Sequence, residues 1–209
     1  MSPPTARDVR FVTHLEQFLP GERPGKPPRL GDRAALAALR RGLGNAPGET
    51  PDMYPYVVAA IPREVGPDQE APYYLVASLF ALHPNIRSRD DAPHANLGDS
   101  MAQLSHAVDG DGPERRFVAL LNAPIEPLDA FAQHLRHAVS LLRAHDIVID
   151  WAQLLTDIRH WPREHRPVQQ AWARSFWTYR PQDTQVDSDA SDGEAVLTHD
   201  TDDDDTDDE

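Results

Sequence analysis

Apolar residues recur at helical spacing through most of this chain, and this pattern limits the possible folds more than any other feature of the sequence. Val168, Trp172 and Phe176 are spaced at i, i+4 and i+8, which places them on one face of a helix. The alternating, β-branched runs that a sheet requires are nearly absent, and residues 146–149 are one short exception. The pattern therefore predicts an all-α protein of about eight helices.

Capping residues, prolines and glycines indicate where the predicted helices begin and end. Asp32 and Asp150 each precede an apolar-periodic run and are typical N-caps, and Gly44 is placed to end the helix that Asp32 begins. The Pro- and Gly-rich loops are expected at residues 20–31, 44–52 and 84–95. The helices are expected around residues 11–19 and over residues 33–43, 72–83, 98–108, 114–122, 127–144, 151–161 and 168–179.

The sharpest break in the helical pattern is D-G-D-G-P at residues 109–113. Two glycines, two aspartates and a proline in five residues disfavour a continuous helix. We therefore expect two packed helical bundles, an N-terminal one over residues 1–108 and a C-terminal one over residues 113–180.

Charge is divided sharply along the sequence. All 20 Lys and Arg residues precede residue 181, whereas residues 181–209 carry 13 acidic residues and no cation. This last segment has almost no large apolar residues, so burial cannot offset the conformational entropy that ordering would cost. It is predicted to be a disordered acidic tail on a body that is close to neutral.

Motifs for catalysis or cofactor binding are missing from the sequence. There is no cysteine, which excludes disulfides, thiolate metal sites and cysteine nucleophiles. Neither a phosphate-binding glycine loop nor a G-x-S-x-G nucleophile turn is present. We expect a protein that is not an enzyme and that needs no cofactor or metal.

Two arrangements leave an enzymatic alternative open. His134 and His137 are spaced at i, i+3 and could bind a metal together with Asp157 or His160, as in a small hydrolase. Asp150 and Asp157 could form a carboxylate pair. The simpler interpretation is that the histidines face solvent, that Asp150 is an N-cap and that Asp157 is a surface charge.

Arginines at helical spacing are the candidate binding residues. Arg33 and Arg40 lie seven residues apart on one predicted helix, and Arg136 and Arg143 repeat that spacing on another. Such pairs could line a track for a phosphodiester backbone, although spacing alone favours ordinary solvated helix faces with acidic partners in the same chain. The residues chosen as nucleic-acid-binding candidates are Arg40, Arg41, Arg115, Arg116, Arg136 and Arg143.

The aromatic residues near the C-terminal end of the body follow the apolar stripes. We expect them to pack in the core rather than to stack on bases, and no aromatic pair typical of RNA-recognition sheets is present. These residues are Trp151, Trp161, Trp172, Phe176 and Trp177.

Several blocks of the sequence, taken in order, form a recognisable series. They are GDRAALAALRRGLG (31–44), YYLVASLFALHP (73–84), NLG (96–98), RRFVALLNA (115–123), LRHAVSLLRAHDIVIDWAQLLTDIRHW (135–161) and VQQAWARSFW (168–177). The most specific part is the pattern D-W-x-x-L-L-x-D at 150–157 followed by Q-x-x-W-A-R-x-F-W at 169–177. Over roughly residues 10–178, the chain resembles the CasB family, the small subunit of the type I-E CRISPR complex Cascade.

The resemblance implies a structural, non-catalytic role. Members of this family are all-helical, and two copies line the complex beside the subunits that hold the guide RNA. Their basic face helps to hold the target and displaced DNA strands of the R-loop. The resemblance supports a nucleic-acid-binding role for Arg40, Arg41, Arg116 and Arg136, and supports it less for Arg115. For Arg143 the support is mainly its helical spacing. Arg33 and Arg87 are weaker candidates still.

The expected partners are therefore the other Cascade subunits, the guide RNA, the target DNA strands and a second copy of this chain. No apolar run is long enough for a membrane span and no signal segment is recognisable, so we expect a cytoplasmic location. The alternative from another class is a helical protein–protein adaptor whose arginines face partner carboxylates rather than nucleic acid.

Overall fold

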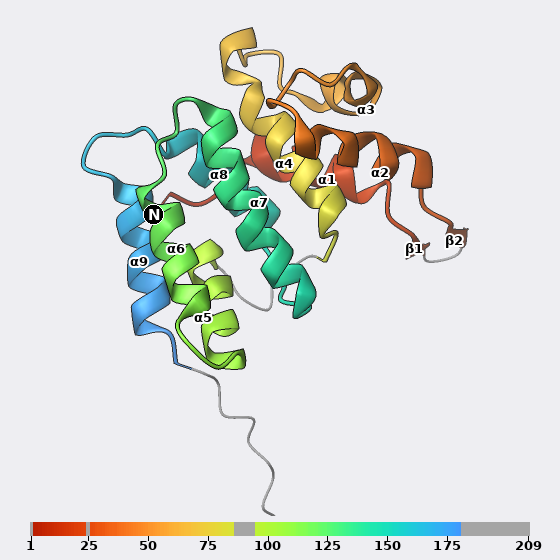
Figure 1. Ribbon diagram of the computed structural model, residues 1–209. Coiled ribbons are helices and arrows are strands. Elements are labelled where there is room, and N and C mark those ends of the chain that lie inside the picture. Colours follow the sequence, from red (N-terminus) through yellow and green to blue (C-terminus); the bar gives the residue numbers. More distant parts are fainter. Residues whose placement is uncertain (1, 24–25, 86–94, 181–209) are drawn as a thin grey trace, which may run out of the picture.

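A computed structural model describes residues 2–23, 26–85 and 95–180, and most of these residues are helical (Figure 1). Within these ranges the chain forms nine α-helices and one short antiparallel hairpin, whose strands are β1 (Gly21–Arg23) and β2 (Lys26–Arg29). The helices are α1 (Ala6–Glu16), α2 (Arg33–Arg40), α3 (Tyr54–Val57), α4 (Ala71–Leu82), α5 (Leu97–Ala107), α6 (Gly112–Asn122), α7 (Leu128–Ala144), α8 (Trp151–His160) and α9 (Pro167–Thr178). The all-α prediction is confirmed.

The predicted caps are present with the expected hydrogen bonds. The Asp32 carboxylate accepts from the Ala35 amide at 2.8 Å at the start of α2. The Asp150 carboxylate accepts from the amides of Ala152 and Gln153 at the start of α8. These bonds satisfy backbone donors that have no partner within the helix, which is why the sequence could locate both helix starts.

Helix α4 lies at the centre of the fold (Figure 1). Nine consecutive residues, from Tyr73 to Ala81, are buried, as expected for a helix that is apolar on all sides. It packs against α2, α7 and α8. The buried apolar residues of these helices and of α1, α5, α6 and α9 belong to one continuous core.

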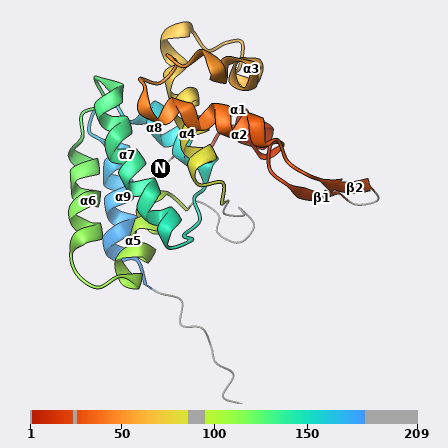
Figure 2. The ribbon, with the colours of Figure 1, turned by 45° about the vertical axis from the view of Figure 1, so that its right-hand side comes forward.

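Helices α5, α6, α7 and α9 pack largely with one another, whereas α8 packs against α1 and α4. Helix α5 packs against α6, α7 and α9, although it precedes the break at 109–113. The break is a turn between two contacting helices, and the division into bundles 1–108 and 113–180 stays a prediction. Figure 2 shows α5, α6, α7 and α9 side by side, with α1 to α4 beside them.

A buried polar junction fastens α1 to α8. The Asp8 carboxylate, which is fully buried, accepts from Arg159 at 2.7 Å and from the Thr156 hydroxyl at 2.8 Å. Asp8 also completes a capping box with Thr5 at the start of α1. The first helix is therefore held against a helix that lies about 150 residues later in the chain.

Two short elements were not predicted. Residues 20–31 were expected to be a loop but contain the β1–β2 hairpin, which extends away from the helices (Figure 2). At its base, Arg29 donates to the carbonyls of Leu19 and Glu16, so a cation satisfies acceptors at the C-terminal end of α1. Helix α3 was also missed, because a four-residue helix that contains Pro55 gives no periodic signal.

Two further expectations concern membrane-spanning helices and the acidic C-terminal segment. None of the helices in the described ranges is long and apolar enough to cross a membrane. The acidic segment 181–209, predicted to be disordered, lies outside the described residues, as does Arg87.

Candidate nucleic-acid interface

The six arginines predicted to contact nucleic acid all have exposed side chains, and each lies in or next to a helix terminus or on an outer helix face. Two follow one another at the end of α2, two lie in the first turns of α6 and two lie on α7. In chain order they are Arg40, Arg41, Arg115, Arg116, Arg136 and Arg143.

Arg136 connects α7 to the turn that follows α2. Its Nη1 atom donates to the carbonyl of Leu43 at 2.7 Å, and Leu43 lies in the 3-10 turn Arg41–Gly44. Arg40, just before this turn, donates from Nε to the carbonyl of Ala81 at 2.6 Å. Since the turn packs on α4, both guanidiniums are fixed to backbone in the same region.

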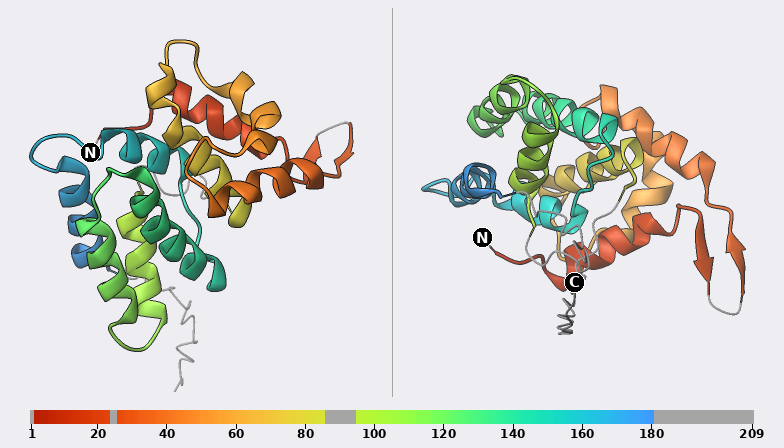
Figure 3. Two further views of the ribbon diagram at one scale, coloured as in Figure 1. Left: turned by 45° about the horizontal axis from the view of Figure 1, so that its top comes forward. Right: turned by 90° about the horizontal axis from the view of Figure 1, so that it is seen from below.

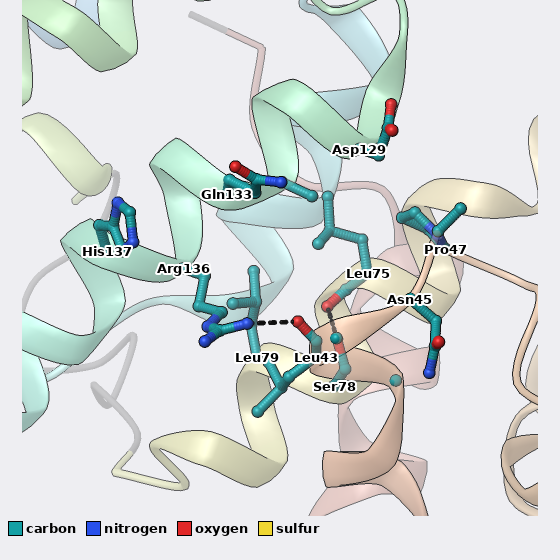
Figure 4. A pocket seen from close by; sticks show the side chains of 14 residues that line it. Leu43, Asn45, Pro47, Leu75, Ser78, Leu79, Asp129, Gln133, Arg136 and His137 are labelled. Atoms are coloured by element: carbon teal, nitrogen blue, oxygen red, sulfur yellow. Dashed lines mark hydrogen bonds between the residues drawn. The ribbon is translucent and has the colours of Figure 1, made fainter.

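A hollow of about 310 Å³ lies beside this contact, between the 3-10 turn and α7. Figure 4 shows Arg136 reaching from α7 to the Leu43 carbonyl, with Gln133 and His137 along the same helix. A guanidinium has five N–H donors, and this hydrogen bond uses one of them. Arg136 can therefore bind a phosphate while it keeps its contact with the turn.

Two of the candidates already form ion pairs on the surface. Arg41 lies 2.8 Å from Asp52, and Arg115 lies 3.0 Å from Asp111. The side chains in both pairs are more than half exposed. Exposed ion pairs contribute roughly 0–1 kcal/mol, so a phosphate can replace either carboxylate at little cost.

The remaining two candidates lie at one end of the α6–α7 pair. Arg116 donates to the carbonyl of Gly112 at 3.2 Å, and the side chain of Arg143 forms no hydrogen bond or ion pair with any residue that the structure describes. Helices α6 and α7 pack together and run antiparallel, so the start of α6 and the end of α7 point the same way (Figures 1 and 2). This end is distinct from the Arg136–Leu43 contact.

The structure thus places the candidates in two groups. The turn group, around the 3-10 turn, is Arg40, Arg41 and Arg136. The α6–α7 group is Arg115, Arg116 and Arg143. Within the described residues no hydrogen bond or ion pair joins the groups, and a single continuous track stays a prediction.

The expectation that Asp157 is a surface charge is wrong. Asp157 is 1 % exposed, and its carboxylate accepts from Gln153 Nε2 at 2.8 Å and from Trp172 Nε1 at 2.7 Å. Burial raises the pKa of Asp157 to about 7, although both hydrogen bonds oppose the shift. Position i+7 after the N-cap Asp150 faces the core here, because α8 is buried on most of its surface.

The proposed metal site is not assembled. His134 and His137 are exposed on α7, whereas both Asp157 oxygens are engaged in the core. Across the described ranges, no three His, Asp or Glu side chains are grouped so that they could bind a metal ion. Asp150 is the N-cap of α8, as the simpler interpretation of this residue predicted.

Four of the five aromatic residues expected in the core are buried there, with Trp161 packed edge-to-face on Trp172. Trp177 is the exception, because 52 % of it is exposed. It follows Phe176, which stacks on Phe117 and takes the inward position. The Trp177 ring therefore packs against the rings of Phe117 and Phe176 from the solvent side.

The arrangement of helices is that of a known class of CRISPR-associated helical proteins. It is similar to the structure of a Cse2-family protein from Thermus thermophilus, with a TM-score of 0.65, 31 % identity and coverage of 85 % of this chain and 99 % of that one. CasB from M. ruber matches with a TM-score of 0.63 and 33 % identity, over 83 % and 93 % of the two chains. A chain from a CRISPR RNA-guided surveillance complex matches with a TM-score of 0.63 and 27 % identity, over 82 % and 91 %.

The family is established by the sequence as well. The family model for CRISPR-associated protein Cse2 matches residues 35–177. The chain belongs to the Cse2 family, in agreement with its resemblance to CasB. No curated protein sequence matches it.

Proposed function

We propose that this chain is a non-catalytic subunit of a type I-E CRISPR surveillance complex, Cascade, and that its exposed arginines contact the DNA strands of the R-loop. The observation that carries the proposal is its similarity to a chain of a CRISPR RNA-guided surveillance complex over 91 % of that chain. The proposed partners are the other subunits, the guide RNA, the target DNA strands and a second copy of this chain, in the cytoplasm.

Backbone contacts suit this role better than base contacts. Replacement of a DNA duplex by an RNA–DNA heteroduplex is nearly balanced in free energy, so a few added phosphate contacts can favour the open state. Arginine binds phosphate with parallel hydrogen bonds and reads no base in doing so. The turn group and the α6–α7 group together offer six exposed guanidiniums for this purpose.

The salt dependence of DNA retention tests the proposal. The variant Arg40→Gln, Arg116→Gln, Arg136→Gln removes three charges and keeps an N–H donor at each position. In the assembled complex, each lost phosphate contact should lower the slope of log affinity against log salt by about 0.7–0.9, hence by roughly 2–3 in total. Filter binding of target DNA over a salt series measures the slope.

The matched control is Arg163→Gln, Arg174→Gln, Arg180→Gln, which removes the same charge from three other exposed arginines. It should leave the slope near the wild-type value. Equal slopes for all three proteins would contradict DNA contact by the two groups. If the first variant instead failed to join the complex while remaining folded, the adaptor alternative would be favoured.

A further inference from the structure

A second basic hollow lies on α1. It has a volume of about 640 Å³ and is formed between α1 and a segment that comprises the 3-10 turn Val58–Ala60 and the residues after it. Its cationic lining consists of Arg7 and Arg10 from α1 and Arg63 from the facing segment. We call these three residues the α1 groove arginines.

The side chains of the α1 groove arginines differ from those of most predicted candidates in their contacts within the described ranges. All three side chains are exposed, and none of them forms a hydrogen bond or ion pair with another described residue. By contrast, Arg41 and Arg115 are paired with aspartates. The charge of the groove arginines is therefore available to an external anion without loss of any described internal contact.

The acidic residues nearby do not neutralise the groove. Glu64 is the one carboxylate in its lining, against three guanidiniums. Asp8 lies between Arg7 and Val9 in sequence, but it is buried and paired with Arg159. The groove thus carries a net positive charge, although the whole chain is strongly acidic.

The position of Arg7 does not stabilise helix α1. Arg7 is in the first turn, where the helix dipole disfavours a cation. Arg7, Arg10 and His14 are spaced at i, i+3 and i+7, so they share one face. His14 Nε2 lies 2.8 Å from the carbonyl of Tyr56 in α3, so this side chain links α1 to the helix that precedes the opposite wall of the groove.

The groove and the turn group are built on different elements of the fold. Seen from below, α1 and α7 lie on opposite sides of α4 (right panel of Figure 3). The turn group contacts α7 and the groove is built on α1. One nucleic-acid strand held by the turn group would therefore leave the groove free for another.

We propose that the α1 groove binds the phosphodiester backbone of single-stranded nucleic acid, as a second contact separate from the turn and α6–α7 groups. The identification of the anion as nucleic acid rests on the proposed function. The residues Ala59, Ala60, Ile61 and Pro62 give the groove a wall without aromatic rings. Binding there depends on phosphate charge and has no base preference.

The test uses the full-length chain and a fluorescein-labelled oligothymidine. Replacement of Arg7, Arg10 and Arg63 by Gln should lower the slope of log affinity against log salt by about 2, since each phosphate contact on a single strand contributes about 0.7. The control Arg163→Gln, Arg174→Gln, Arg180→Gln should retain the slope. Thermal unfolding confirms that both variants are folded.

The Nε–Hε NMR signals of the arginines separate this inference from the proposed function. Addition of oligothymidine should shift the signals of Arg7, Arg10 and Arg63, and sodium chloride should reverse the shifts. Shifts confined to Arg40 and Arg136 would overturn the second site and leave the proposed function standing. Equal or larger shifts with polyglutamate would overturn it in favour of an acidic peptide.

Discussion

At the scale of single residues, Asp157 has the most unusual environment in the described structure. Its carboxylate lies in the core between Gln153 and Trp172, without a cation bonded to it. The Oε1 atom of Gln153 is buried and lacks a hydrogen-bond partner. Burial disfavours the ionised carboxylate at this site, although its two hydrogen bonds favour that form.

Stability should therefore fall as the pH rises through the range in which Asp157 ionises. The unfolded carboxyl has a pKa near 3.9 and the folded one is raised to about 7. Between these values the folded chain holds one more proton, so this residue lowers the free energy of unfolding by about 1.4 kcal/mol per pH unit as pH rises. Above about pH 7 the stabilising contribution of the protonated Asp157 to the free energy of unfolding is completely lost.

The variant Asp157→Asn should lose this part of the pH dependence. The amide oxygen can still accept from Trp172 Nε1, and the amide nitrogen can donate to Gln153. Urea unfolding of both proteins between pH 4 and pH 8 gives the difference in free energy at each pH. That difference should move in favour of the variant as pH rises; a constant difference would show that Asp157 does not take up a proton in this range.

At the scale of elements, the contact between α5 and α9 depends on a glycine. A Cβ atom on Gly98 would lie 2.2 Å from the backbone carbonyl oxygen of Trp172. Backbone cannot move away as a flexible side chain can, so the two helices can approach this closely only with glycine at this position.

Gly98→Ala should destabilise the fold by roughly 1–3 kcal/mol, because α5 must shift away from α9. Gly44→Ala is the matched control, since no heavy atom outside its immediate neighbours lies within 4 Å of the added Cβ. Chemical denaturation of the two variants measures the free energies of unfolding. Similar values for both would mean that the α5–α9 contact is looser than described.

Elements were predictable from the sequence where the signal is local. Side-chain caps such as Asp32 and Asp150 act within three residues, so helix starts could be read directly. The β1–β2 hairpin and α3 are short, and nothing in their composition distinguishes them from loops. Their structure depends on contacts outside the segment, such as the hydrogen bonds of Arg29 to the end of α1.

At the scale of the whole molecule, the features that the sequence did not predict are those that depend on contacts between residues far apart in the chain. The burial of Asp157 depends on α9, and the exposure of Trp177 depends on Phe176 taking the inward position. The arginine candidates were found by spacing, but the Leu43 carbonyl that fixes Arg136 lies 93 residues away. The α1 groove was missed because Arg63 joins Arg7 and Arg10 only in the folded chain; the R-x-x-R spacing of residues 7–10 was a signal for part of it.

The proposed function depends most on contact between the turn group and DNA inside the assembled complex. The most direct measurement is photo-cross-linking from p-benzoylphenylalanine placed at position 136, with position 174 on α9 as the control. We predict a cross-link from position 136 to a strand of the target DNA, formed only after the target is bound, and none from position 174. Cross-links from position 136 to protein alone, with and without target, would contradict it.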